Sequence, residues 1–174
     1  MAVEDNKMRE ILLEKVVINI GIGYNDNMLP NAKALLKKIT GKEAMATYSK
    51  RRDPSLRLRK GQAIGAMVTL RKDDAVNALK RMLDAKGNVV RMNSISENTL
   101  SFGIKEYIDI AGIKYDPKIG MMGMHVNSSF ARRGKRVSSR KRFSSSIGKK
   151  HSIITKEELA DYLKKNYDAK ISEE

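Results

Sequence analysis

Two short segments hold almost all of the net positive charge of this chain, and this limits how the chain can fold. The 174 residues include 35 Lys and Arg but only 20 Asp and Glu, a net charge of +15. Residues 49–60 contain six basic residues and one acidic residue, and residues 131–151 contain nine basic residues and no acidic one. Charged side chains are rarely buried without partners. The hydrophobic core must therefore come from the remaining residues, whose charges nearly balance.

The two basic segments are typical of a protein that binds a polyanion. Residues 49–60 include Pro54 and only two apolar residues, and residues 131–151 are rich in Arg, Lys, Ser and Gly. Blocks of like charge repel each other, so we expect residues 131–151 to be mobile in the free protein. Phe143 is their one aromatic residue, which favours contacts with phosphates and helix shape over stacking on single strands. The partner indicated is a nucleic acid.

The rest of the chain alternates between strand and helix patterns. In residues 11–20, Val16, Ile18 and Ile20 share one face of a β-branched segment, as in a half-buried strand. Apolar residues at helical spacing follow Pro30, and Gly41 marks the end of this predicted helix. Thr155 and Glu158 have the spacing of a capping box, which predicts a last helix over about 155–166. The segments assigned in this way are strands over 11–20, 43–48, 62–71, 99–104 and 121–130, and helices over 30–41, 74–85 and 155–166.

This order predicts a single α+β domain over residues 1–174. We expect an antiparallel or mixed β-sheet with helices packed on one face, and a second face left free for a ligand. The basic loop 49–61 is expected at the tip of a hairpin, and the basic insertion 131–151 before the last helix. Asp73 is the predicted N-cap of the middle helix. The predicted apolar stripes of the last two helices consist of Val76, Leu79 and Leu83, and of Leu159, Tyr162 and Leu163.

No motif for catalysis or cofactor binding stands out. Gly21-Ile22-Gly23 lacks the third glycine of a dinucleotide site, because position 26 is Asp26. The two histidines, His125 and His151, lack metal-ligand spacing, and without cysteine a thiolate metal site is excluded. We therefore expect no enzyme activity, no cofactor and no metal. With no signal peptide and no long apolar run, we also expect a cytoplasmic protein without a membrane partner.

Six blocks of the sequence follow one another in an order that is typical of a known family. They are EKVVINIGIG (14–23), LLKKITGKEAMATYSKR (35–51), LRKGQAIGAMVTLR (58–71), LSFGIKEYIDIAGIKYDP (100–117), GMHV (123–126) and ITKEELADYL (154–163). These blocks resemble the L-five family of large-subunit ribosomal proteins, which bind 5S ribosomal RNA. The insertion at 131–151 before the last helix is similar to the archaeal and eukaryotic-type branch.

The resemblance implies a structural role in the large ribosomal subunit. Members of the family hold 5S rRNA in the central protuberance, largely through the sheet and adjoining loops. Their long hairpin loop approaches the peptidyl-site tRNA, and another edge meets a small-subunit head protein in an intersubunit bridge. The partners implied are thus 5S rRNA, large-subunit rRNA, peptidyl-site tRNA and neighbouring ribosomal proteins.

The resemblance also assigns residues to these contacts. Many relatives have Gln where this chain has Lys42, so an amide contact is expected to become a phosphate contact. The residues assigned to 5S rRNA are Asn19, Lys42, Thr47, Thr69 and Arg71. The tRNA-contacting loop residues are Arg51, Arg52, Arg57, Arg59 and Lys60. The general rRNA phosphate-binding residues are Arg132, Arg133, Lys135, Arg136, Arg140, Lys141, Arg142, Lys149 and Lys150.

Three other functions remain open at this point. A nucleic-acid chaperone outside the ribosome would show no preference for 5S rRNA. A peripheral membrane protein needs an amphipathic basic helix, which Gly, Pro and Ser interrupt in both basic segments. An RNA-modifying enzyme would need a catalytic or cofactor motif. We also expect the body to stay folded when residues 131–151 are deleted.

Overall fold

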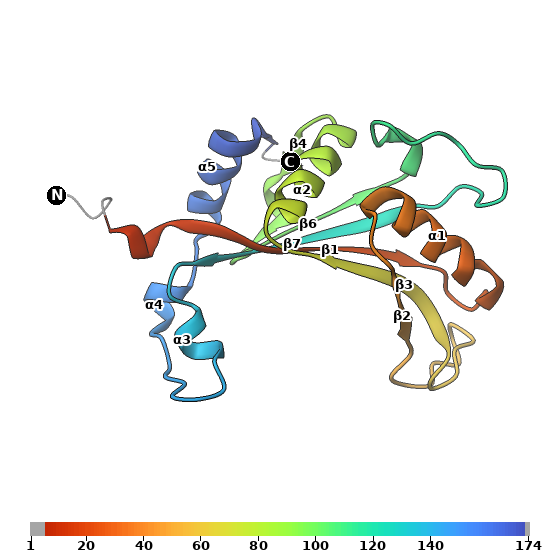
Figure 1. Ribbon diagram of the computed structural model, residues 1–174, viewed down its shortest axis with the longest axis horizontal. Helices are drawn as coiled ribbons and strands as arrows, with labels where there is room; N and C mark the ends of the chain where they lie inside the picture. Colours follow the sequence, from red (N-terminus) through yellow and green to blue (C-terminus); the bar gives the residue numbers. More distant parts are fainter. Residues whose placement is uncertain (1–5, 173–174) are drawn as a thin grey trace.

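A six-stranded antiparallel sheet runs through the middle of the molecule (Figure 1). The computed structural model describes residues 6–172, except for the side chain of Asp26. Within these residues the strand order is β2-β3-β1-β7-β6-β5, and β4 and β8 form a separate parallel pair. The strands are β1 (Ile11–Gly21), β2 (Met45–Tyr48), β3 (Ala63–Leu70), β4 (Val89–Arg91), β5 (Ile95–Ser96), β6 (Thr99–Ile104), β7 (Met124–Arg132) and β8 (Lys170–Ser172).

Three longer helices cover one face of this sheet (Figure 1). The α+β fold expected from the sequence is therefore confirmed. The helices are α1 (Leu29–Thr40), α2 (Asp73–Ala85), α3 (Arg136–Ser139), α4 (Lys149–Ser152) and α5 (Lys156–Tyr167), with short 3₁₀ turns at Lys7–Arg9, Asp26–Met28, Met92–Ser94 and Tyr107–Asp109.

The central strand β1 joins the two halves of the sheet. Val16, Ile18 and Ile20 are buried under the helices, as their alternation predicts. β1 pairs with β3 on one side and with β7 on the other. Gly65 in β3 is needed for this close approach, since a Cβ there would lie 2.5 Å from the carbonyl oxygen of Ile20. A larger residue at position 65 would push the backbones of β1 and β3 apart.

The first and last helices begin and end as their local sequences predict. Pro30 lies in the first turn of α1, and Gly41 ends that helix in the left-handed region at φ 71°. At the start of α5, the Thr155 and Glu158 side chains form the predicted capping box. Phe130 of β7 meets Tyr162 of α5 edge-on, with ring centroids 5.8 Å apart, which fixes α5 over the sheet.

Two expectations for α2 are wrong. The N-cap is Lys72 with no side-chain cap, and Asp73 is already the first helical residue. Val76 is exposed, while Ala75 and Ala78 are buried beside Leu79. Small alanines at the contact let the helix approach the sheet closely, so the buried stripe is rotated away from the larger Val76. Asp73 and Asp74 still favour the helix start through the helix dipole.

The last long strand also differs from its prediction. β7 begins at Met124 rather than at residue 121, and it continues to Arg132, inside the segment expected to be a basic insertion. Ala131 and Arg132 are both buried. The short strands β4, β5 and β8 were not expected, because two or three residues are too few to show an alternating pattern.

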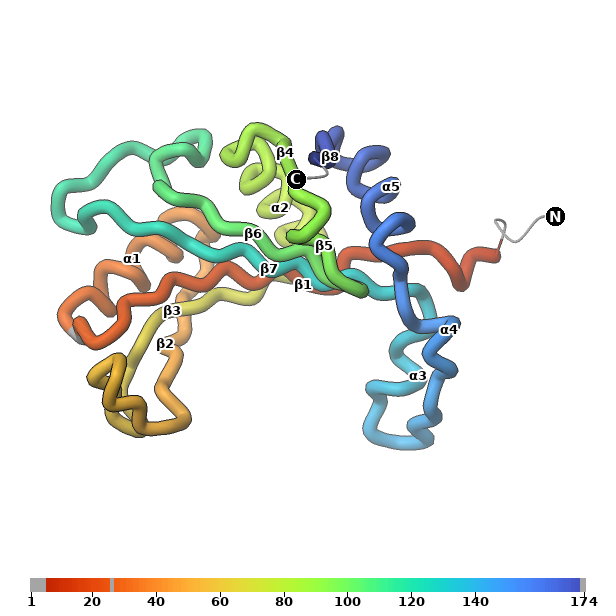
Figure 2. Tube along the Cα trace, turned by 180° about the vertical axis from the view of Figure 1, so that it is seen from behind, coloured from red at the N-terminus to blue at the C-terminus, as the bar shows by residue number. Residues whose placement is uncertain are grey.

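Two projections extend from the side of the sheet opposite the helices (Figures 1 and 2). One is the tip of the β2–β3 hairpin, residues 49–61, called the basic loop below. The other carries α3 and α4 and is called the basic leg (residues 133–152). Among the described residues no helix has the length and apolar character needed to cross a membrane.

Candidate nucleic-acid interface

The sheet face away from the helices is polar and carries few charges. Its central row runs across four strands as Met67, Asn19, His125 and Gly103. The next row consists of Thr69, Val17, Asn127 and Ser101. Because the helices lie on the other side, these side chains are available to a ligand. This open face offers amide, hydroxyl and imidazole groups, which suit hydrogen bonding to nucleic acid.

Three of the five residues assigned to 5S rRNA lie on this open face. Asn19 and Thr69 are partly exposed in neighbouring strands. Thr47 lies on the edge strand β2, opposite Gly65, and its Oγ1 would be 2.9 Å from a Cβ at that position. The open face thus brings together side chains from three strands that are distant in sequence.

The other two residues of that set lie elsewhere. Lys42 follows α1 and forms an ion pair with Asp74 in the first turn of α2, within the helix layer. Its ammonium group is therefore engaged on the far side of the sheet from the open face. Arg71 is exposed just after β3 ends, between the sheet and α2. The structure does not bring Lys42 together with Asn19 and Thr69.

The basic loop is organised by hydrogen bonds of its backbone. Asp53 and Leu58 exchange two such bonds, of 3.1 and 2.9 Å, and the Asp53 carboxylate accepts from the amide and hydroxyl of Ser55. The Ser55 hydroxyl is the main reason why the pKa of Asp53 lies below its ordinary value. Five basic side chains are predicted to contact tRNA, and none of them forms an ion pair or hydrogen bond with the side chains and backbone that the structure describes, which exclude the side chain of Asp26: Arg51, Arg52, Arg57, Arg59 and Lys60.

The basic leg contains two short helices, α3 and α4, joined by an irregular segment of residues 140–148. The amide of Ser145 donates to the carbonyl of Val137, which ties its two limbs together. Near the tip, the Arg140 Nε donates to the carbonyl of Phe143 at 2.7 Å. The Phe143 side chain is 87% exposed. This ring is available to stack on a base or a ribose beside the surrounding cations.

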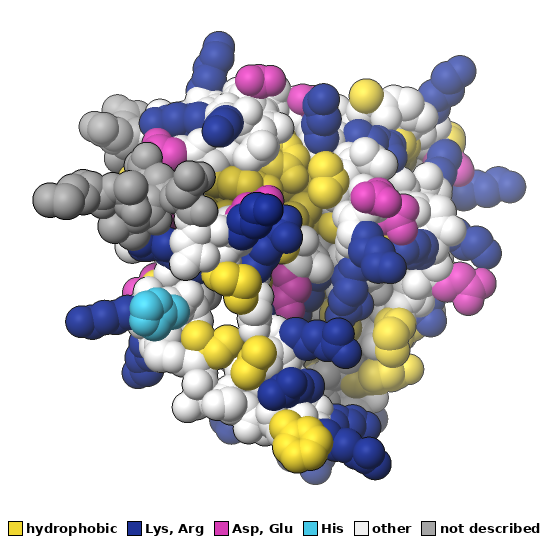
Figure 3. Space-filling view, turned by 60° about the vertical axis from the view of Figure 1, so that its left-hand side comes forward, with side chains coloured by type: hydrophobic (Ala, Val, Ile, Leu, Met, Phe, Trp, Pro, Cys, Tyr) yellow, Lys and Arg dark blue, Asp and Glu magenta, His cyan; other side chains and the backbone are white. Residues whose placement is uncertain are grey.

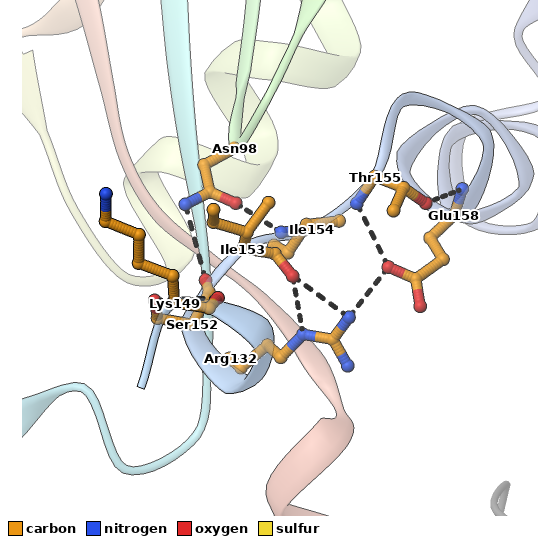
Figure 4. A network of polar contacts seen from close by, with 8 residues as sticks. All are labelled: Asn98, Arg132, Lys149, Ser152, Ile153, Ile154, Thr155 and Glu158. Atoms are coloured by element: carbon orange, nitrogen blue, oxygen red, sulfur yellow. Dashed lines mark hydrogen bonds and ion pairs between the residues drawn. The ribbon is translucent and has the colours of Figure 1, made fainter. Parts of the chain in front are cut away.

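Both ends of the leg meet one cluster of polar contacts, drawn in Figure 4. The Arg132 guanidinium donates to the carbonyl of Ile153 at 3.2 and 3.3 Å and to the Glu158 carboxylate at 2.7 Å. From the β5–β6 turn, Asn98 donates to the carbonyl of Ser152 and accepts from the amide of Ile154 at 2.6 Å. We call these residues, together with Thr155, the clasp.

The clasp changes the interpretation of Arg132. Its side chain is 6% exposed, whereas a phosphate-binding residue must reach the solvent. Arg133 and Lys135 are also paired, with Glu10 and Glu14 at the start of β1, but remain about half exposed. The other six predicted phosphate-binding residues are exposed and have no ion pair among the described residues: Arg136, Arg140, Lys141, Arg142, Lys149 and Lys150.

The ionisation of Glu158 reflects its place in the clasp. Partial burial would raise the pKa of its carboxyl group. Hydrogen bonds from the Thr155 backbone and the Arg132 guanidinium outweigh burial and hold the pKa of Glu158 below its ordinary value. Glu158 is therefore ionised at neutral pH, and it compensates the buried charge of Arg132.

Lys and Arg side chains are spread over the whole face of the molecule drawn in Figure 3, with Asp and Glu side chains between them. A hollow of about 810 Å³ lies between the leg and the start of the chain. Met8, Val137 and Ile147 supply apolar walls, and Arg133 and Lys150 contribute cations. Among the side chains that the structure describes, no group of three His, Asp or Glu residues is placed to hold a metal ion.

The sequence analysis did not assign His125, Asn127 or Ser101 to an RNA contact. The alternation in residues 99–104 and 121–130 identifies which side chains share a face. The alternating pattern does not reveal which strands are neighbours in the sheet. The proximity of His125 to Asn19 follows only from the pairing of β1 with β7.

Comparison with known proteins gives the family. A family model described as "Ribosomal protein L5" matches residues 6–59, and the model of the C-terminus of the same ribosomal family matches residues 63–160. The chain belongs to the ribosomal protein L5 family. It is therefore a structural ribosomal protein and not an enzyme. The two matched regions meet at the tip of the basic loop, but both contribute strands to one sheet.

Relatives from archaea cover almost the whole chain. Large ribosomal subunit protein uL5 of Nitrosopumilus maritimus is 40% identical over 97% of this chain and 97% of its own length. The uL5 protein of Pyrobaculum aerophilum is 42% identical over 94% and 91%, and that of Archaeoglobus fulgidus is 42% identical over 91% and 89%. The resemblance to the archaeal-type branch of the L5 family is confirmed.

Proposed function

We propose that this L5-family protein is a component of the large ribosomal subunit that binds 5S rRNA through the open face of its sheet. The observation that carries the proposal is the polar face itself. It joins Asn19, Thr69 and His125 across three strands and has a cationic projection on either side. Family membership and the names of the archaeal relatives give the ribosomal context.

Selectivity and affinity come from different parts of this surface. Amide and hydroxyl groups in fixed positions recognise the shape and edges of one RNA. The projections add affinity by displacing counterions from phosphates. If about six phosphates are neutralised, log K falls against log salt concentration with a slope of roughly −4 to −5. A slope near −1 would contradict the electrostatic part.

The basic loop is proposed to contact the peptidyl-site tRNA. Its five basic side chains are exposed and unpaired within the described residues, and its backbone is held by the Asp53–Leu58 bonds. The basic leg is proposed to bind phosphates of large-subunit rRNA. The same assignment puts the protein in the central protuberance of cytoplasmic ribosomes, where another edge meets a small-subunit head protein.

Competition binding tests the central proposal. Labelled 5S rRNA is bound to the protein at near-physiological salt and challenged with excess tRNA or with random RNA. The proposal predicts that 5S rRNA resists both competitors. Equal competition would leave only a general polycation, as expected of a nucleic-acid chaperone.

Two sets of variants separate the open face from the loop. Asn19→Ala and Thr69→Ala are expected to reduce the preference for 5S rRNA over random RNA. Replacing Arg57, Arg59 and Lys60 together by Ala is expected to spare 5S rRNA binding and to weaken tRNA engagement in ribosomes. Equal loss of both activities in the loop variant would contradict the division between face and loop.

A further inference from the structure

The side chains of Arg132 and Asn98 form hydrogen bonds with other parts of the protein. Arg132 belongs to the most basic stretch of the chain, yet its donors reach a carbonyl and a carboxylate of the protein. Asn98 has φ 60° in the two-residue turn between β5 and β6, a backbone conformation that Asn accepts more readily than most residues. From this turn its amide bonds the chain on both sides of Ile153.

Together these two side chains close the base of the basic leg. Arg132 is the last residue before the leg, and Ile153 is the first residue after it. The Arg132–Ile153 bonds therefore join the two ends of an excursion of about twenty residues. Asn98 ties the returning end to the sheet, because its own carbonyl accepts the amide of Phe130 in β7 at 2.8 Å.

We propose that Arg132 and Asn98 are positioning residues that hold the basic leg as a preformed surface for RNA. This inference rests on the proposed RNA-binding role of the leg. The leg contains eight basic residues and no acidic residue, so its charges repel one another. Ordering such a segment during binding would reduce the affinity, and holding it in place beforehand removes that loss.

The clasp also fixes the direction in which the leg extends from the sheet. Its base is fixed to β7, to the β5–β6 turn and to the start of α5. Ion pairs of Arg133 with Glu10 and of Lys135 with Glu14 hold the outgoing limb along β1. The leg, which carries the six exposed cations without ion pairs among the described residues, then extends from the side of the sheet opposite the helices (Figure 2).

Two substitutions that preserve the net charge test this inference in the full-length protein. Arg132→Lys keeps a cation but lacks the planar fork that holds Ile153 and Glu158 at once. Asn98→Gly keeps a residue suited to positive φ and removes only the amide. The probe is a labelled RNA duplex of about twenty base pairs. Each substitution is expected to weaken binding roughly tenfold, the effect of losing preorganisation, with an unchanged salt slope.

Controls separate this inference from the binding role itself. Asn93→Gly is the matched control, because Asn93 is an exposed residue outside the clasp. Arg142→Met removes an exposed cation of the leg, and it is expected to lower the salt slope by about 0.9. Thermal melting is used to check that each variant is folded at the temperature of the binding assay.

Three results would overturn the inference, each in a different way. Native affinity in both Arg132→Lys and Asn98→Gly would show that the leg needs no positioning. Native affinity in Arg132→Lys, with weaker binding and a lower slope in Arg132→Met, would make Arg132 a direct phosphate contact. Unchanged binding in Arg142→Met and in a protein lacking residues 134–151 would remove the leg from RNA binding and thus reject the underlying role as well.

Discussion

The basic loop and the basic leg have similar compositions but are held in different ways. The loop is the tip of a hairpin, and its order comes from backbone bonds within the loop, with Asp53 as its single acidic residue. The leg has no acidic residue of its own, and its base is bound by Glu10, Glu14 and Glu158 from other elements. Because the loop lies between two paired strands, it needs no such partners. The leg joins a strand to a helix and depends on side chains to fix its ends.

This difference separates cations that build the structure from cations that are free for a ligand. All five basic side chains assigned to tRNA in the loop are unpaired among the side chains that the structure describes. Just before the leg, Arg132 is buried, and within the leg Arg133 and Lys135 form ion pairs with carboxylates. Net charge alone therefore overstates the electrostatic contribution expected from residues 131–151.

The largest effect is expected from removing Arg132. Arg132→Met leaves the Ile153 carbonyl and the Glu158 carboxylate without their partner. Arg132 is buried but Glu158 is 38% exposed, so water partly replaces the lost partner, and the expected loss is about 1–3 kcal/mol. Urea unfolding at neutral pH measures the loss. Arg52→Met is the matched change in the basic loop, and it is expected to alter stability by less than about 0.5 kcal/mol. Similar values for both would contradict a structural role for Arg132.

A smaller effect is expected at the N-terminus of α5. Thr155→Ala removes the hydroxyl that accepts the amide of Glu158 at 3.3 Å. Loss of such an N-cap typically lowers the free energy of unfolding by about 1 kcal/mol. Thermal melting detects this change. Ser49→Ala is the counterpart at the base of the loop, where the hydroxyl donates to the Arg51 carbonyl. Its melting temperature is expected to stay within error of the native value.

Local signals explain which elements could be predicted. The capping box of α5 lies within four residues, and the alternation of β1 is continuous, so both follow from nearby sequence. The burial of Val76 was mispredicted because helical spacing alone does not say which of two adjacent stripes faces the sheet. Here alanine, the smaller residue, makes the contact. The three shortest strands gave no pattern to read.

The candidate site was predictable only in part for the same reason. Asn19 and Thr69 were assigned through the family resemblance, and the structure places both on the open face. Arg132 could not be distinguished from Arg142 by composition. The distinction arises because β7 extends to residue 132 and because Glu158, far along the chain, returns beside it. The assignment of Lys42 to RNA likewise took no account of its ion pair with Asp74, because Lys42 follows α1 whereas Asp74 lies in α2, more than thirty residues further along the chain.

Acid pH offers a graded way to weaken the leg without changing the loop cations. The folded protein holds the pKa of Glu158 below its ordinary value, so the unfolded chain takes up a proton first as the pH falls. The stability contributed by Glu158 is thus present above the unfolded pKa of about 4.3 and is lost as the pH falls through the folded pKa. Urea unfolding between pH 6 and about 3 is expected to show this loss. Glu158→Gln should flatten that part of the profile, and an unchanged profile would count against the pairing.

The smallest effect on global stability is expected from Asp53, although it organises the basic loop. Its carboxylate accepts from the amide and hydroxyl of Ser55 at the solvent-exposed tip. Asp53→Ala removes these bonds but touches neither the core nor the clasp, so the urea midpoint should not change. The backbone bonds between Asp53 and Leu58 should open more often, which faster hydrogen exchange of those two amides would reveal. Arg142→Met in the leg is the matched control and should leave loop exchange unaltered. If Asp53→Ala instead lowered the global midpoint as Arg132→Met does, the loop would be part of the folded body, and the contrast between the two projections would fail.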